Sequence, residues 1–299
     1  MRALVTGATG FIGRRLVGKL TKPVVLSRDP ESARRSLGGD VEVHGWDPEA
    51  GPPVYDLLRG VDTVFHLAGE PVAEGRWNEP KKSRIRKSRL LGTRHLVTAI
   101  EAMGERPKVL VSGSAVGFYG DRGDEELDES SAPGADFLAA VCQEWEAEAE
   151  RAASLGVRTV RIRTGVVLDR SGGALPRMTL PFRFGLGGRL GNGRQWMPWI
   201  HLDDLVGLLL HAAQNPAVTG AMNGVAPAPA TNREFTRRLA AVLRRPAIFP
   251  VPALALRAAV GEFAGILLAS QRVLPRVAEK TGYRFRYAGL EEALRAALG

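Results

Sequence analysis

Short apolar runs alternate with amphipathic segments through the first half of the chain, and turn residues separate them. Such runs predict buried strands, whereas apolar residues recurring every three or four positions predict helices packed on a sheet. This alternation is typical of a doubly wound parallel α/β sheet. Strands are predicted at residues 3–5, 23–26, 40–44, 61–69, 109–112 and 157–162, and helices at 14–20, 84–103 and 136–153.

A glycine-rich turn joins the first predicted strand to the first predicted helix. It contains Gly7, Thr9, Gly10 and Gly13. Gly7 permits a tight turn, Gly10 lets the backbone approach a diphosphate, and Gly13 lets the helix pack closely on the strand. Free N–H groups at the helix start attract an anion. Strand, turn and helix come in the order that a dinucleotide-binding motif requires, so the turn predicts a diphosphate site.

The end of the second predicted strand carries Ser27, Arg28 and Asp29. At this place a dinucleotide fold binds the adenosine ribose, with an acid for the 2′-hydroxyl of NAD or an arginine for the 2′-phosphate of NADP. A hydroxyl beside a guanidinium suits a phosphate. Asp29 precedes Pro30 and is interpreted as a turn or helix-capping residue. The pattern therefore favours NADP.

The second half of the chain differs in its sequence pattern, because loop residues become frequent. Glycine-rich loops predominate at 172–193, and helices are predicted at 202–213 and 231–243, the latter capped by Thr231 or Asn232. A short strand is predicted at 221–223, and the tail 252–299 is predicted to be mostly helical, with a short strand at 283–285. We expect an NADP-binding domain at 1–165, with segments near 198–225 interleaved, and a smaller substrate domain at 166–299.

Composition restricts the function further. The 299 residues are 44% hydrophobic and include one cysteine, Cys142, which favours a reducing, cytoplasmic environment over a disulfide framework. The apolar runs are too short for a transmembrane helix, and the first reads as a strand rather than a signal peptide. The five histidines show no metal-ligand spacing, so no metal is expected.

The chain is basic, with a formal net charge of +9. Its arginines are interpreted as spread along the whole chain with acidic residues among them. The densest cluster, residues 81–89, lies on one predicted helix and lacks interleaved aromatic residues. A solvated or phosphate-facing helix explains it better than a nucleic-acid site, so neither nucleic acid nor a membrane is an expected partner.

Four motifs occur in the order seen in extended short-chain dehydrogenases/reductases, the relatives of nucleotide-sugar epimerases. They are TGATGFIG at 6–13, DTVFHLAG at 62–69, SAVGFYG at 114–120 and WIHLDDL at 199–205. The segments LAGEP at 67–71, RWNEP at 76–80 and NGVAPAPATNREF at 223–235 resemble a sub-branch of NADP-dependent, epimerase-like proteins with a short C-terminal domain of unknown function. The resemblance covers essentially the whole chain and implies a Rossmann-type fold.

This resemblance implies roles for individual residues. Ser114 would hydrogen-bond the substrate and contact the cofactor, and Arg89 occupies a position that contacts the cofactor in the family. Other relatives form dimers through a four-helix interface, which implies a homodimer here. The remaining implied cofactor contacts are Gly7, Gly10, Phe11, Ile12 and Gly13 for the diphosphate, Ser27 and Arg28 for the 2′-phosphate, Leu67 and Ala68 for the adenosine and ribose, and Gly165 and Val166 beneath the nicotinamide.

The chain departs from the family at its proton-transfer pair. Extended short-chain dehydrogenases carry Tyr-x-x-x-Lys, in which the lysine lowers the pKa of the tyrosine. Here Phe137 and Val141 occupy those positions, and neither can move a proton. Tyr119 and Glu70 are the candidate substitutes, although packing beneath its turn is the commoner role for an aromatic residue such as Tyr119, and Glu70 could cap the next segment.

Two further side chains have plainer interpretations. His66 is expected to be a packed core histidine and Cys142 a buried thiol.

Two functions remain open. One is an NADP-dependent oxidoreductase or epimerase acting on a small polar substrate, with arginines of the 172–193 region holding an anionic group. The other is an NADP(H)-binding sensor that has lost proton transfer.

Overall fold

The computed structural model describes residues 1–299 and confirms the predicted fold class. Seven parallel strands form one sheet in the order β11-β7-β5-β4-β1-β2-β3, so the strand order reverses direction at β1 and β4. The strands are β1 (Ala3–Thr6), β2 (Val24–Ser27), β3 (Glu42–Gly45), β4 (Thr63–His66), β5 (Val109–Ala115), β7 (Arg158–Thr164) and β11 (Gly220–Gly224).

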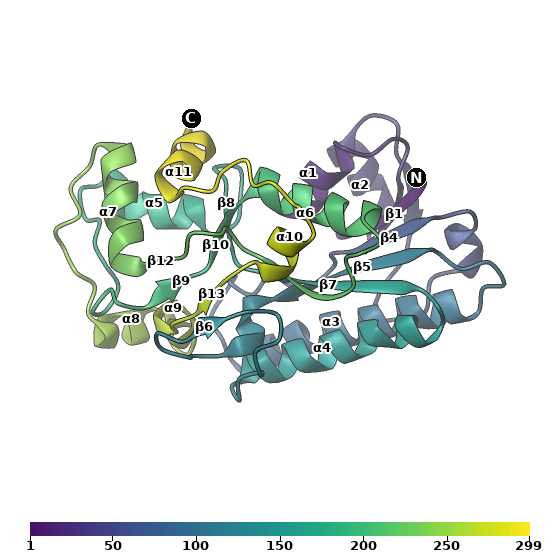
Figure 1. The fold of residues 1–299 in the computed structure, drawn as a ribbon, viewed down its shortest axis with the longest axis horizontal. Coiled ribbons are helices and arrows are strands. Elements are labelled where there is room, and N and C mark those ends of the chain that lie inside the picture. The colour runs from purple at the N-terminus through teal and green to yellow at the C-terminus, as the bar shows by residue number, and fades with distance from the viewer.

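Helices cover both faces of this sheet (Figure 1). On one face, α1 (Phe11–Val17), α2 (Pro30–Leu37) and α6 (Leu202–Gln214) bury Leu16, Ala33 and Leu205 against alternate strand residues such as Val5. On the other, α3 (Glu79–Glu101) and α4 (Phe137–Ser154) lie side by side and bury Leu96 and Ala149 against Leu4. Side chains alternate across a strand, so two-sided burial explains the continuous apolar runs of the sequence.

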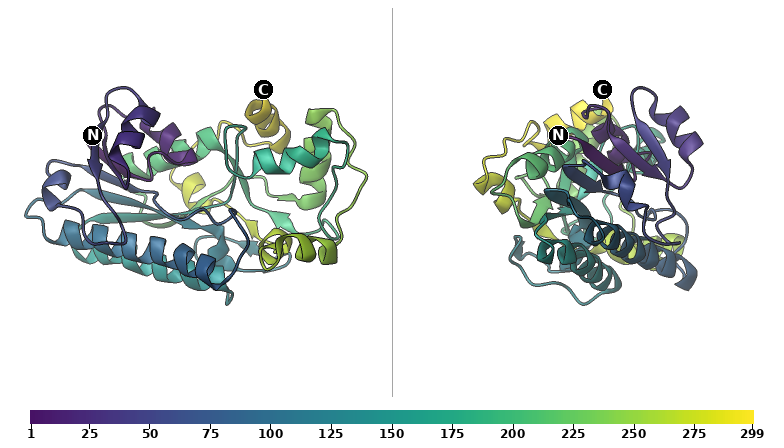
Figure 2. Two further views of the ribbon diagram at one scale, coloured as in Figure 1. Left: turned by 180° about the vertical axis from the view of Figure 1, so that it is seen from behind. Right: turned by 90° about the vertical axis from the view of Figure 1, so that its right-hand side faces the viewer.

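A smaller lobe lies beyond the carboxyl edge of the sheet, at the left of Figure 1 and at the right of the first view in Figure 2. Its own core contains Phe182, Trp199, Phe235 and Leu294. Its helices are α5 (Leu175–Arg183), α7 (Asn232–Leu243), α8 (Ala253–Val260), α9 (Phe263–Leu268) and α11 (Leu290–Leu298), whereas α10 (Arg276–Lys280) packs against β11 and buries Ala278 in the core of the sheet. The short strands pair as β8 (Val166–Leu168) with β10 (Trp199–His201), β9 (Trp196–Met197) with β12 (Ala230–Thr231), and β6 (Glu126–Leu127) with β13 (Arg272–Val273).

One local prediction for this lobe is wrong. Residues 283–285 form no strand: the chain there wraps around the buried carboxylate of Asp204, which accepts hydrogen bonds from the amides of Arg286 (2.8 Å) and Tyr287 (2.9 Å). The region 172–193 is loop-rich as predicted, but it also contains one helix, α5, which is stabilised by burial of Leu175 and Phe182. Only tertiary packing reveals this helix, because its prolines and flanking glycines are typical of loops.

Candidate functional site

The glycine turn after β1 has the geometry that the sequence predicts. Gly7 has φ +70°, and a Cβ there would lie 2.7 Å from the carbonyl of Leu67 in the turn after β4. A Cβ on Gly13 would overlap the carbonyl oxygen of Gly7. Gly10 is the N-cap of α1 and offers no side chain to cap it. The turn is therefore built from bare backbone, as a close approach to an anion requires.

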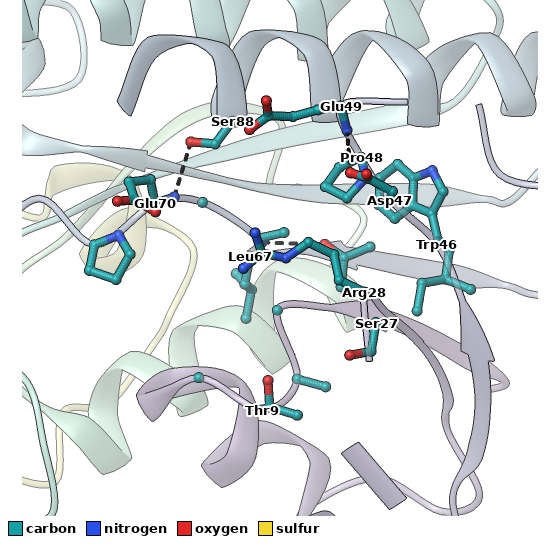
Figure 3. Close-up of a pocket in the computed structure, with 18 of the residues that line it drawn as sticks. Thr9, Ser27, Arg28, Trp46, Asp47, Pro48, Glu49, Leu67, Glu70 and Ser88 are labelled. Carbon is teal, nitrogen blue, oxygen red and sulfur yellow. Dashed lines mark hydrogen bonds between the residues drawn. The ribbon is translucent and has the colours of Figure 1, made fainter. Parts of the chain in front are cut away.

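A cavity of about 520 Å³ opens beside this turn, at the carboxyl edge of the sheet (Figure 3). Its walls come from the segments that follow four adjacent strands, β1 to β4, where ligands of doubly wound sheets bind. Its size is typical of small-molecule sites. It is lined by Thr6, Gly7, Ala8, Thr9, Gly10, Leu26, Ser27, Arg28, Trp46, Asp47, Pro48, Glu49, Leu67, Ala68, Gly69, Glu70, Pro71, Arg84 and Ser88.

Arg28 contributes an unpaired positive charge to the cavity. It is exposed, and its guanidinium makes no ion pair or hydrogen bond within the protein. Asp29, by contrast, is engaged as the N-cap of α2, where its carboxylate accepts a hydrogen bond of 2.9 Å from the amide of Ser32. The interpretation of Asp29 as a capping residue is confirmed. Figure 3 shows Ser27 and Arg28 at the same cavity as Thr9 and Leu67.

Glu70 lies at the opposite end of the cavity and forms an ion pair with Lys81. The Lys81 ammonium is 2.7 Å from the carboxylate and is itself only 5% exposed, whereas Glu70 is 25% exposed. The hydrogen bond from Lys81 lowers the pKa of Glu70 below its usual value. Glu70 is therefore a carboxylate at neutral pH, so it can accept a proton but cannot donate one.

Ser88 and Arg89 of α3 hold the turn that carries Glu70. The hydroxyl of Ser88 accepts a hydrogen bond of 3.0 Å from the Glu70 amide, and Arg89 donates one of 3.0 Å to the Glu70 carbonyl. The Arg89 guanidinium also lies over the ring of Trp145, and burial lowers its pKa. Arg89 is absent from the cavity wall, so in this structure it positions the turn.

Ser114 and Tyr119 belong to a buried polar network rather than to the cavity wall. Ser114 donates a hydrogen bond of 2.6 Å to Glu146, which also receives two from Arg163. Tyr119 is fully buried, donates to Asn223 (2.7 Å) and accepts from Arg163 (3.0 Å). Burial raises the pKa of Tyr119 to about 12. This geometry favours a packing role for Tyr119, one of the two roles compatible with its sequence position.

Phe137 and Val141 both serve packing. The ring of Phe137 meets Trp77 edge-on at 5.7 Å, and Trp77 in turn packs against Phe263 of the smaller lobe at 5.9 Å. Val141 is buried. Cys142 is also buried, which raises the pKa of its thiol to about 12 and confirms its interpretation as a buried thiol.

His66 is the packed core histidine that the sequence indicates. Its ring nitrogens lie 2.7 Å from the hydroxyl of Thr6 and 3.0 Å from that of Thr93, and full burial lowers its pKa to about 4. Neutral and doubly hydrogen-bonded, it fixes β4 against β1 and α3.

The segment that contains Gly165 and Val166 lies where the sheet meets the smaller lobe. A Cβ on Gly165 would lie 2.5 Å from the carbonyl oxygen of Pro198, and the Val166 amide donates to that same oxygen. Phe11 packs its ring against Gly172 and Gly173 of the following loop. These residues border the junction of the two lobes, outside the 520 Å³ cavity.

Sequence reasoning missed part of the cavity wall. Trp46, Asp47, Pro48 and Glu49 follow β3 and line the cavity, as does Arg84 of α3. The position of these residues after the third predicted strand could have indicated them, because the carboxyl ends of parallel strands meet at one edge of the sheet. In the structure β3 is the edge strand beside β2. No three His, Cys, Asp or Glu side chains converge as metal ligands, and none of the helices is long and apolar enough to cross a bilayer.

Comparison with known proteins agrees with this geometry. The model of the "NAD dependent epimerase/dehydratase family" matches residues 3–223, and that of a domain of unknown function, DUF1731, matches residues 251–297. The chloroplastic SDR39U1 homolog of Arabidopsis thaliana, named an epimerase family protein, is 42% identical over 99% of this chain and 86% of its own. The epimerase family protein YfhF of Bacillus subtilis is 38% identical over 98% of this chain and 97% of its own.

Among solved structures, the human epimerase family protein SDR39U1 with NADPH is similar along 99% of both chains, with 38% identity and a TM-score of 0.87. The resemblance that the motifs indicate, including the C-terminal domain of unknown function, is confirmed. The chain belongs to the NAD-dependent epimerase/dehydratase family.

Proposed function

We propose that the cavity beside the glycine turn binds NADP(H), and that the protein is an oxidoreductase or epimerase acting on a small polar substrate. The free guanidinium of Arg28 carries this proposal, since it lies beside Ser27 where a 2′-phosphate would be placed while Asp29 is engaged in capping α2. The backbone fits the group, because the side chains absent from Gly7 and Gly13 would close the cradle. Human SDR39U1, solved with NADPH, supports the choice of cofactor.

The chain's own residues suggest how a substrate is handled. Glu70 is a carboxylate on the cavity wall and would accept the proton of a substrate hydroxyl, with Lys81 stabilising its charge. Ser114 lies outside the cavity wall and gives its hydrogen to Glu146, so its lone pairs would accept a hydrogen bond only from a second donor on the substrate, not from the hydroxyl that gives its proton to Glu70. Bound nicotinamide would supply hydride transfer. Tyr119 is assigned to structure in this scheme.

The cofactor proposal is tested by titrating NADPH and NADH while following nicotinamide fluorescence. Arg28→Ala should weaken NADPH binding about tenfold or more, because a charge-assisted hydrogen bond contributes about 1.5–3 kcal/mol. NADH affinity should change little. Arg35→Ala in α2 removes an equally exposed arginine that does not line the cavity, and it serves as the control. Equal losses in both variants would contradict the assignment.

A regulatory NADP(H)-binding protein without turnover is the second candidate. Phe137, Val141 and Tyr119 favour it, since the first two cannot move a proton and the third is tied into a buried network. Carbonyl and alcohol substrates would be screened against protein filled with NADPH or NADP. Turnover that collapses in Glu70→Gln but persists in Tyr119→Phe supports the enzyme, whereas binding without turnover supports the sensor.

The cellular compartment and the oligomeric state of the protein are each proposed from a single feature. A single buried thiol suits the reducing cytoplasm, which fractionation of the source cells would test. The adjacent helices α3 and α4 present one long surface for a homodimer, as in other members of the fold (Figure 2). Light scattering of the full chain measures the mass directly, and a monomer at micromolar concentration would contradict the dimer.

A further inference from the structure

The positive charge of this protein is concentrated in two stretches of the smaller lobe, residues 171–200 and 232–261. Together they hold ten arginines and one acidic residue, Glu234, so their excess of nine positive charges equals the formal net charge of the whole chain. The expectation that the arginine excess is scattered over the whole chain is therefore wrong. The ten are Arg177, Arg183, Arg189, Arg194, Arg233, Arg237, Arg238, Arg244, Arg245 and Arg257.

The fold brings the two stretches together. The amide of Val251 donates to the carbonyl of Arg189 (2.8 Å), and the amide of Gly191 donates back to the carbonyl of Val251 (2.8 Å). The amide of Arg233 donates to the carbonyl of Gly193 (2.9 Å). Figure 1 shows α7 and the chain leading from it to α8 at the left end of the molecule, opposite β1, α1 and α2. The segment made of α7 and the chain leading to α8 is thus remote from the cavity beside the glycine turn.

These arginines lack counter-charges of their own. Of the ten, only Arg238 forms an ion pair, with Glu291 at 2.6 Å and Glu234 at 3.9 Å. Of the other 31 lysines and arginines in the chain, 19 form an ion pair. Gathering like charges without partners costs free energy through repulsion. A bound anion would offset that cost.

Three of the ten arginines line a second cavity, of about 390 Å³. They are Arg189, Arg233 and Arg237, and the remaining wall is formed by Thr236, Ala240, Ala247, Ile248 and Pro250, with no carboxylate among them. Arg189 and Arg233 each donate one hydrogen bond to a backbone carbonyl, of Gly191 (3.0 Å) and Asn192 (3.3 Å), which restrains them and leaves their other N–H groups free. Arg237 has no partner within the protein.

We propose that this second cavity binds a small organic phosphate, with the phosphate held by the three guanidinium groups and the organic part against Ala240, Ala247 and Ile248. The guanidinium fork matches phosphate oxygens in pairs. A phosphate monoester carries about −1.5 to −2 charges and three acceptor oxygens, so it satisfies several arginines where a carboxylate satisfies one. The site shares no wall residue with the cavity assigned to NADP(H), and it is independent of that proposal.

Calorimetric titration of the full chain with phenyl phosphate at low ionic strength tests the site. The triple variant Arg189→Gln, Arg233→Gln, Arg237→Gln should lose about tenfold or more in affinity, because charge-assisted hydrogen bonds contribute about 1.5–3 kcal/mol each. The control triple variant Arg183→Gln, Arg245→Gln, Arg257→Gln removes the same charge from the same stretches but no wall residue. It should stay within about twofold of the wild type, as expected for screened surface charges.

Thermal melts establish that both triple variants are folded, and a variant with lysine at the three wall positions keeps the charge while removing the fork. Its affinity should lie between those of the wild type and the glutamine variant. Inorganic phosphate should bind more weakly than phenyl phosphate, because it makes no use of the apolar wall. Equal losses in both glutamine variants, or no heat with the wild type, would overturn the proposal. NADPH titration of the same samples reports separately on the cofactor cavity.

Vesicles of phosphatidylcholine and phosphatidylglycerol at three to one distinguish a lipid headgroup from a free metabolite. Sedimentation of the wild type that is lost in the wall variant and kept in the control identifies a phosphate carried by a lipid. Calorimetric binding without sedimentation identifies a free ligand, and both results support the site. Sedimentation that persists equally in both triple variants would assign the arginines to a general basic surface and overturn the cavity.

Discussion

Ser114 in β5 donates a hydrogen bond of 2.6 Å to Glu146 in α4, and both side chains are buried. The acceptor carboxylate is fixed in turn by two hydrogen bonds, of 2.8 and 2.9 Å, from Arg163 in β7. Three neighbouring elements are thus joined by one buried charge pair. The arrangement sets the direction of the Ser114 hydroxyl, whose oxygen can accept a hydrogen bond while its proton is engaged.

Glu146→Gln should destabilise the fold by about 3–5 kcal/mol, because it leaves the Arg163 guanidinium buried without a counter-charge. Urea unfolding followed by circular dichroism measures the change. Glu144→Gln on the same helix breaks the exposed pair with Arg86 and should cost about 1 kcal/mol or less. Similar midpoints for the two variants would show that the buried pair is not the stabilising element.

Tyr119→Phe should leave NADPH affinity unchanged while lowering stability by about 1–3 kcal/mol, because it leaves Asn223 and Arg163 each without one buried partner. Fluorescence titration and urea unfolding measure the two quantities. The variant separates the two roles that the sequence leaves open for this tyrosine. A large loss of turnover at a temperature where the variant is still folded would restore Tyr119 as a catalytic residue.

Gly13→Ala should abolish NADPH binding and destabilise the protein, because the new Cβ would overlap the carbonyl oxygen of Gly7. Gly18→Ala is the matched control at the other end of α1, where φ is −64° and the nearest atoms lie 3.7 Å from the built Cβ. That substitution should be neutral or stabilising by about 0.4–1 kcal/mol. NADPH binding retained by Gly13→Ala would mean that the turn accommodates a side chain.

Stability should fall as the pH drops from 6.5 towards 4. His66 is neutral in the fold, with its pKa lowered to about 4, whereas the unfolded chain titrates near the ordinary value of 6.5. Between these values the unfolded state binds more protons, so protonation favours unfolding. The full loss is about 3 kcal/mol and is complete below the folded-state pKa.

His66→Gln keeps hydrogen bonding to Thr6 and Thr93 within reach but does not titrate. Denaturant midpoints of this variant at pH 7.5 and 5 should therefore differ less than those of the wild type. If the two proteins lose stability in parallel over this range, the acid sensitivity arises from other groups.

The sequence by itself determined the alternation of strands and helices, the glycine turn and the cap at Asp29, because these depend on local backbone geometry and on burial of contiguous runs. It also indicated the family through motifs that lie on those elements. That Phe137 and Val141 replace the family's tyrosine and lysine stays a prediction.

Only the tertiary structure decided which groups meet. The partner of Glu70 lies eleven residues away, on a helix whose start was predicted five residues too late, and Tyr119 meets Asn223 across 104 residues of chain. Neither basic stretch indicates a binding site by itself. Their arginines come together because the Val251 amide donates a hydrogen bond to the Arg189 carbonyl. Such contacts depend on how distant segments pack, and local propensity carries no information about that.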